Sequence, residues 1–181
     1  MAAGSKLHGN AKLAHASESV KGEPLRFAAD CMLGRLARWL RILGHDASYF
    51  RRIHDADLVE LAVRERRILL TRDTRLVQRR AARGALLIRS HLLEDQLREM
   101  FLWNREALLA PGLCRRCPEC NSATVPVEKI AIRERVPAYV FKTQAQFLEC
   151  PSCHRVYWRA THVRDILRRL RRSLSVDMKK A

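Results

Sequence analysis

Three aspartates in this sequence follow segments that are predicted to form strands. Asp30 directly follows the apolar residues 25–29, Asp73 lies two positions after the apolar residues 67–71, and Asp55 opens a segment with helical spacing. An ionised carboxylate is costly at the end of a core strand unless a partner compensates it. Carboxylates brought close together repel one another unless a cation lies among them. The trio therefore predicts a site for Mg²⁺ or Mn²⁺, which take oxygen ligands and promote phosphodiester hydrolysis.

The same aspartates have a simpler explanation, because aspartate is a favoured N-cap of helices. Under that alternative, Asp30, Asp55 and Asp73 each begin a separate helix and share no ligand. Two further acids, Asp57 and Asp95, lie in expected first turns, and whether either joins the site is left open. Two arginines, Arg35 and Arg72, flank the proposed site. They are candidates for phosphate contact, or they are simply exposed to solvent.

Five of the six cysteines lie between positions 114 and 153. They include two C-x-x-C pairs, formed by Cys117, Cys120, Cys150 and Cys153. Two such pairs predict two knuckles that together donate four thiolates to one structural Zn²⁺. With all four ligand positions filled, this site has no opening for a substrate. Cys114, His154 and His162 are alternative ligands that the spacing leaves open.

The elements that must position these groups alternate between short apolar runs and segments of helical periodicity. The expected strands are residues 25–29, 47–50, 67–71 and 85–89, and the expected helices are residues 33–43, 55–65, 74–83 and 92–109. This alternation predicts βαβ units and a parallel sheet with helices on both faces. Sites in such sheets form beyond the carboxyl ends of the strands, where Asp30 and Asp73 fall and onto which the loop before Asp55 opens.

The first expected helix is amphipathic. Its apolar residues recur at helical spacing, whereas Arg35, Arg38 and Arg41 are expected on the outward faces. Between the two cysteine knuckles, residues 124–134 and 139–148 are expected to form the strands of a zinc ribbon. The aromatic residues that follow the second knuckle, and that either stack on bases or pack the ribbon onto the main domain, are Tyr157 and Trp158.

The sequence divides into three parts. We expect a disordered tail over residues 1–24, an α/β domain over residues 25–110, and a zinc ribbon with a basic helix over residues 111–181. The chain carries 35 Lys and Arg against 19 Asp and Glu, a net charge of +16, which favours a polyanionic partner such as nucleic acid. No apolar run is long enough to span a membrane and no secretory signal is visible, so a cytoplasmic location is expected.

Four motifs occur in order along the chain. Residues 27–46 read FAADCMLGRLARWLRILGHD, residues 67–73 read RILLTRD, residues 116–121 read RCPECN, and residues 150–158 read CPSCHRVYW. Together they resemble the Mut-seven C-terminal RNase family. The resemblance covers about residues 25–165 and implies a PIN-like nuclease fold with a C-terminal zinc ribbon.

The resemblance also implies metal-dependent RNA cleavage, with acids at Asp30, Asp55 and Asp73 and zinc ligands at the four cysteines of the two pairs. The expected architecture is therefore α/β: a PIN-like parallel sheet flanked by helices, then a small β zinc ribbon and a basic C-terminal helix.

The main functional hypothesis is a ribonuclease that hydrolyses RNA phosphodiester bonds at a three-aspartate Mg²⁺ or Mn²⁺ site. Two alternatives remain open: a non-catalytic RNA- or DNA-binding zinc-ribbon module, and a toxin-like nuclease controlled by a partner protein. RNA is the expected partner. A protein partner is left open, and no contact with a membrane is expected.

Overall fold

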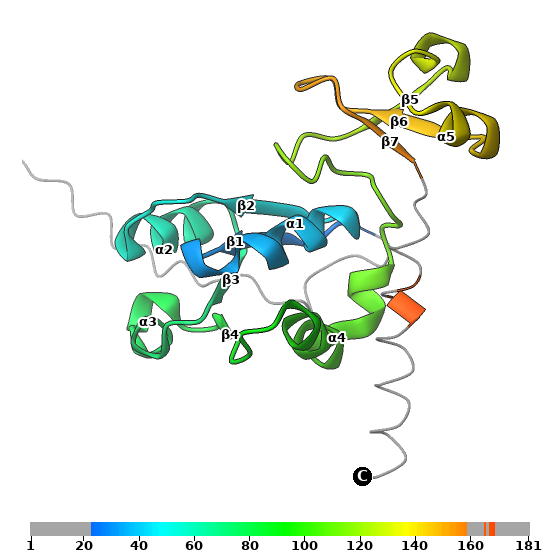
Figure 1. The fold of residues 1–181 in the computed structure, drawn as a ribbon. Coiled ribbons are helices and arrows are strands. Elements are labelled where there is room, and N and C mark those ends of the chain that lie inside the picture. Colours follow the sequence, from blue (N-terminus) through cyan, green and yellow to red (C-terminus); the bar gives the residue numbers. More distant parts are fainter. Residues whose placement is uncertain (1–22, 159–164, 166, 169–181) are drawn as a thin grey trace, which may run out of the picture.

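The computed structural model of this chain describes residues 23–158, 165, 167 and 168. Its first part is built on four parallel strands: β1 (Arg26–Ala29), β2 (Asp46–Tyr49), β3 (Ile68–Thr71) and β4 (Leu86–Leu87). They lie in the order β2-β1-β3-β4 (Figure 1). Because the strands are parallel, their carboxyl ends share one edge of the sheet, which we call the carboxyl edge. Their amino ends share the opposite, amino edge.

Helices cover both faces of this sheet (Figure 1). The helices are α1 (Gly34–Ile42), α2 (Asp55–Arg64), α3 (Thr74–Gln78) and α4 (Leu93–Leu109), with 3₁₀ turns η2 (Cys31–Leu33) and η3 (Arg80–Ala82). Successive residues of a strand point to opposite faces. Phe27 and Ala29 accordingly join a core with α1 and α4, whereas Ala28 joins a second core with α2 and α3. The expected parallel sheet flanked by helices is confirmed.

Two elements are shorter than the sequence predicts. The strand expected over residues 85–89 pairs with its neighbour only at Leu86–Leu87. The helix expected over residues 74–83 is divided into α3 and η3, because Arg79 between them has an extended backbone, with φ −67° and ψ 134°.

The second part is a three-stranded antiparallel sheet in the order β5-β6-β7. Its strands are β5 (Val125–Val127), β6 (Phe147–Glu149) and β7 (Val156–Trp158), and a 3₁₀ turn η4 (Lys129–Ile132) and helix α5 (Ala138–Thr143) lie between β5 and β6. The prediction of long strands over residues 124–134 and 139–148 is therefore wrong for most of their length. Pro137, at the N-cap of α5, cannot donate a ladder hydrogen bond, and Ile132, Val136 and Phe147 form a separate small core.

The expected tail over residues 1–24 and the expected basic helix from His162 fall mostly outside the described residues. Of that helix, Asp165, Leu167 and Arg168 are described; all three are helical, and Leu167 packs against the core of α1 and α4. Among the helices that the structure describes, none has the length and apolar character needed to cross a membrane.

Candidate active site and candidate metal centre

Asp30 lies at the carboxyl edge, directly after β1. The register pairs Ala29 of β1 with Leu70 of β3, so Asp30 falls beside Thr71. One carboxylate oxygen, Oδ2, accepts hydrogen bonds from the Thr71 hydroxyl at 2.5 Å and from the backbone N–H of Arg72 at 2.9 Å. The other, Oδ1, accepts from the backbone N–H of Met32 at 2.6 Å. Three donors therefore hold this nearly buried carboxylate in one orientation.

Asp73 is tied to Asp30 through Thr71. The backbone N–H of Asp73 donates to the Thr71 hydroxyl oxygen at 2.9 Å, and the Asp73 carboxylate accepts from the backbone N–H of Arg75 at 2.7 Å. Thr71 is fully buried, so its hydroxyl is a fixed bridge between the two segments. The sequence predicts Thr71 only as the end of a strand. Its signal was a hydroxyl residue two positions before the aspartate.

The capping alternative also holds for these two residues. Asp30 is the N-cap of η2 and Asp73 is the N-cap of α3. Capping does not exclude a role at a shared site, because Oδ1 of each aspartate accepts the capping hydrogen bond. The Oδ2 atom of Asp30 is turned to β3 instead, which a cap alone does not require.

Asp55 opens onto the same edge but is engaged elsewhere. It is the first residue of α2, and His54 rather than Asp55 occupies the N-cap position. The Asp55 carboxylate lies 3.2 Å from the guanidinium of Arg79, an ion pair about half exposed on both sides. Within residues 23–158, no hydrogen bond links Asp55 to Asp30 or Asp73. The structure therefore links two of the three predicted acids, Asp30 and the backbone of Asp73, through the Thr71 hydroxyl. A metal site of all three acids stays a prediction.

The flanking residues lie as follows. Asp57 and Asp95 are exposed in the first turns of α2 and α4. Arg35 is exposed on α1, as the sequence predicts. A terminal nitrogen of Arg72 lies 2.7 Å from a ring nitrogen of His91. The buried Nε atom of Arg72 has no hydrogen-bond partner among the described residues.

The four cysteines of the C-x-x-C pairs converge as the sequence predicts. Their sulfur atoms all lie within 4.8 Å of one another, with Cys117 and Cys153 at 3.6 Å and Cys120 and Cys150 at 3.4 Å. Four sulfurs placed about 2.3 Å from a central zinc would stand about 3.8 Å apart. In the part of the chain that the structure describes, this is the one group of three or more acidic, cysteine or histidine side chains that could hold a metal ion.

The surroundings act unequally on the thiols of this cluster. Against the hydrogen bond from the Arg155 backbone, burial and the other cysteine sulfurs raise the pKa of Cys153 to about 12. Hydrogen bonding to the side chain and backbone of Ser122 lowers the pKa of the Cys120 thiol to about 6. The Tyr157 hydroxyl lies 3.0 Å from the Cys117 sulfur, so Tyr157 packs within the ribbon rather than presenting its polar tip to solvent. Because the donors are four sulfurs with no open position, the set fits structural Zn²⁺.

Two of the three alternative ligands, His154 and Cys114, do not join the cluster. His154 is exposed, with Nδ1 3.6 Å from the Glu149 carboxylate. The backbone N–H of Cys114 donates to the carbonyl of Ile42 at 2.7 Å, which ties the segment before the first knuckle to α1. His162 lies outside the described residues.

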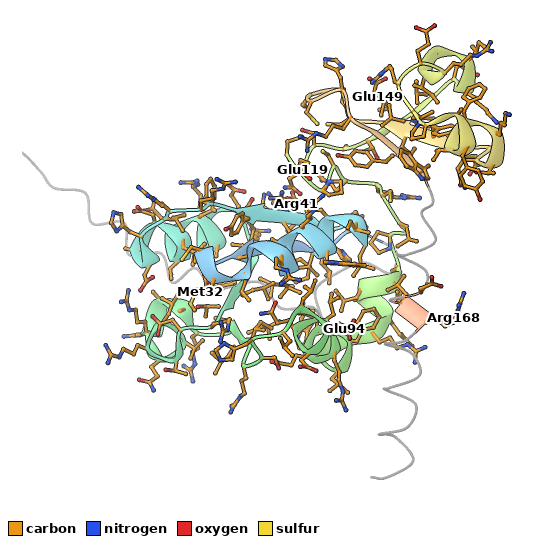
Figure 2. All side chains as sticks on the ribbon, viewed as in Figure 1. Met32, Arg41, Glu94, Glu119, Glu149 and Arg168 are labelled. Atoms are coloured by element: carbon orange, nitrogen blue, oxygen red, sulfur yellow. The ribbon has the colours of Figure 1, made fainter. Side chains whose placement is uncertain are left out.

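The first knuckle docks on the amino edge of the parallel sheet, far along α1 from Met32 (Figure 2). Arg41 of α1 donates to the carbonyls of Pro118 and Glu119 at 3.1 and 2.9 Å and to the carbonyl of Ala47 at 2.9 Å. The prediction that Arg41 lies on an outward face is therefore wrong. Arg41 is buried because the knuckle supplies the carbonyl oxygens that its guanidinium requires.

Asp46, the first residue of β2, is the second link between knuckle and sheet. Its carboxylate accepts from the Asn121 side-chain amide at 2.7 Å and from Arg67 at 2.8 Å, and Asn121 in turn accepts from the Ala47 backbone at 3.1 Å. Although burial acts to raise it, the hydrogen bonds from Arg67 and Asn121 hold the pKa of Asp46 below its usual range. Sequence reasoning missed this buried network because it joins residues far apart in the chain.

His45 ties three segments together at the same edge. The backbone N–H of Leu25 donates to His45 Nδ1 at 3.0 Å, and Nε2 lies 3.0 Å from the carbonyl of Leu108 at the end of α4. Since Nδ1 accepts, Nε2 carries the proton and the ring is neutral. Burial lowers the pKa of His45 to about 4, against the opposing effect of the Leu108 carbonyl.

Residues 25–170 match the family model described as the Mut7-C RNAse domain, which is more than half of the chain. The chain gave no match among curated proteins and none among solved structures.

Proposed function

Because this chain belongs to the Mut7-C RNAse domain family, we propose that it is a ribonuclease that hydrolyses RNA phosphodiester bonds at Asp30, Asp55 and Asp73 with Mg²⁺ or Mn²⁺. The single observation that carries the proposal is the hydroxyl of Thr71, which donates to the Asp30 carboxylate and accepts from the Asp73 backbone. Two acids from different strand ends are thereby held at one place on the carboxyl edge, where sites of parallel sheets form.

The donor set fits a hard cation. Carboxylate oxygens are the ligands that Mg²⁺ and Mn²⁺ prefer, and the nearby Arg72 and His91 are placed to contact a phosphate. When bound, such a cation supplies Lewis acidity, lowering the pKa of a water and stabilising the leaving oxygen. Thr71 and the Arg72 backbone hold the Asp30 carboxylate in one orientation. Asp55 joins by leaving its exposed ion pair with Arg79, which costs less than about 1 kcal/mol.

The four cysteines are proposed to hold a structural Zn²⁺, which supports the ribbon rather than the chemistry. The spacing of the four sulfurs supports this assignment. RNA is the proposed partner, on the strength of the family and of the net charge of +16.

The test is cleavage of a labelled RNA in Mg²⁺ or Mn²⁺ by the wild type, Asp30→Asn, Thr71→Val and Asp57→Asn. Asp30→Asn removes a proposed metal ligand, and we expect the rate to fall by at least about 100-fold. Thr71→Val leaves the acid but removes its hydroxyl partner, so a smaller loss is expected. Asp57→Asn is the matched control, because this exposed acid lies outside the proposed site.

Cleavage by Asp30→Asn at the wild-type rate would refute the proposed site. A wild type that binds RNA but cleaves none in either metal would instead support the non-catalytic binding module. Circular dichroism and melting temperature of each variant exclude loss of folding as the cause.

A further inference from the structure

Phe50, Arg51 and Arg52 follow β2 at the carboxyl edge, and the site described above does not use them. We propose that this segment is a binding site for one unpaired nucleotide of the RNA, with the base on the Phe50 ring and the adjoining phosphates on Arg51 and Arg52. The inference rests on the proposed function, because it takes RNA as the ligand and Asp30 as the neighbouring cleavage site.

The register of the sheet places this segment beside Asp30. Ala29 of β1 pairs with Tyr49 of β2, and the next residues of the two strands are Asp30 and Phe50. The neighbouring Tyr49 is held in place, since its hydroxyl donates to the carbonyl of Cys31 at 3.3 Å. Successive side chains of a strand point to opposite faces, so Phe50 points away from the core that Tyr49 joins.

Gly34 helps to hold Tyr49. A β-carbon at this glycine would lie 2.6 Å from the tip of the Tyr49 ring, closer than such atoms approach in proteins. The Tyr49 ring reaches this position against the first turn of α1 because position 34 has no side chain. The end of β2 and the turn after Asp30 are thus packed together, and the segment that begins at Phe50 starts from a fixed point.

Phe50 is exposed although its chemistry favours burial. Its exposed fraction is 44%, it belongs to none of the apolar clusters, and it contacts no other aromatic ring among the described residues. Met32, whose backbone N–H caps Asp30, is 57% exposed at the neighbouring strand end (Figure 2). Apolar side chains that remain in water beside a polar site provide a surface on which a base can stack.

The charge beside this surface suits a phosphate chain. Arg51 and Arg52 are exposed and form no ion pair within residues 23–158. By contrast, Arg41 and Arg67 at the amino edge are buried and donate hydrogen bonds to protein oxygens. An aromatic ring followed by two arginines that have no ion pair among the described residues is the combination that single-stranded nucleic acids require: a stacking platform with cations along the backbone. A base-paired strand could not offer its ring face to Phe50, so the nucleotide must be unpaired.

The test measures binding without cleavage. Zinc-loaded full-length protein is titrated, in buffer without Mg²⁺ or Mn²⁺, against a short fluorescein-labelled single-stranded RNA and against the same strand annealed to its complement. Phe50→Ala should weaken binding of the single strand about 5- to 100-fold and leave the duplex within about twofold. Leu102→Ala, an equally apolar and exposed residue on α4, is the matched control and should change neither affinity.

Phe50→Trp should restore the affinity, and its added tryptophan fluorescence should be quenched by saturating single strand, a signal that a structural role would not produce. Arg51→Ala and Arg52→Ala should each lower the slope of log affinity against log salt by about 0.7. Arg64→Ala, an exposed arginine ion-paired to Glu60, should leave the slope unchanged.

Wild-type affinity in Phe50→Ala, or an equal loss for single strand and duplex, would overturn the inference. These outcomes are separate from the proposed function, because no step of the binding assay needs cleavage. A wild type that binds through Phe50 yet cleaves no RNA when metal is added would refute the nuclease and leave this binding site standing.

Discussion

The two edges of the parallel sheet differ in whether their charged side chains are paired within the protein. At the amino edge, Asp46 and Arg67 are buried and paired, and the first cysteine knuckle closes over them through Asn121. At the carboxyl edge, Asp30 is held by neutral donors rather than by a cation, and Arg51 and Arg52 have no described partner. Charges satisfied within the protein stabilise the fold, whereas charges left unsatisfied remain for a ligand. The difference supports a structural role for the amino edge and is consistent with the chemistry proposed at the carboxyl edge.

Loss of the cysteine cluster should give the largest effect and should remain confined to the amino edge. Cys150→Ser removes a buried ligand, and structural zinc sites contribute roughly 10 kcal/mol or more to folding. We expect hydrogen exchange to show lost protection in β5–β7 and at the Ala47 amide, which donates a hydrogen bond to the Asn121 side chain. The Asp30 amide, bonded to the Leu70 carbonyl, should stay protected. Cys31→Ser, outside the cluster, is the control.

Ribbon amides that stay protected in Cys150→Ser would show that zinc does not support the ribbon. Equal loss of protection at the Asp30 amide would show instead that the two edges are not independent.

Breaking the buried ion pair should have the next largest effect. Arg67→Met leaves Asp46 buried without its main cation and should lower the free energy of unfolding by about 3–5 kcal/mol. Arg26→Met is the matched control, because Arg26 contacts the same Asp46 and Glu65 from an exposed position and should cost less than about 1 kcal/mol. Urea unfolding of both variants measures the difference. Equal losses would mean that burial does not distinguish the two arginines.

Acid should lower the free energy of unfolding through His45, which is buried at the amino edge. Its pKa is about 4 in the folded chain and 6.5 in the unfolded chain, so below pH 6.5 the unfolded state binds the proton first. The stabilisation is complete above pH 6.5 and is lost as pH falls toward 4, by about 3 kcal/mol in total. Unfolding free energies of wild type and His45→Gln across this range measure it, since the variant should lack this slope. The exposed His54→Gln should keep it.

The smallest change in stability is expected at the carboxyl edge. Arg79→Ala breaks an exposed ion pair with Asp55 and should alter the free energy of unfolding by less than about 1 kcal/mol. It frees the Asp55 carboxylate, however, so the Mn²⁺ concentration for half-maximal cleavage should fall. Arg80→Ala, at the next exposed position, should leave that concentration unchanged. A higher Mn²⁺ requirement in Arg79→Ala would argue that Arg79 assists the site instead of competing for Asp55.

Local patterns predicted much of this protein. The apolar runs and helical spacing identified β1, β3 and the helices of the α/β part, and the C-x-x-C spacing identified all four sulfurs of the cluster. Strand ends located Asp30 and Asp73 at one edge. The errors have a common origin in contacts between distant segments: Arg41 looked solvated on its own helix, and the chain before Pro137 looked extended by its apolar content.

The amino-acid sequence alone identified the residues that are proposed to carry the chemistry, because strand periodicity and cysteine spacing are local properties of the chain. The tertiary structure alone decided which of these side chains are bonded to other groups of the protein. In the folded chain, Asp55 forms an ion pair with Arg79, and Arg41 donates hydrogen bonds to the knuckle carbonyls. The Thr71 hydroxyl donates to Asp30. The physical reason is that a buried polar group must find a partner wherever the fold supplies one, and that partner can lie anywhere in the sequence.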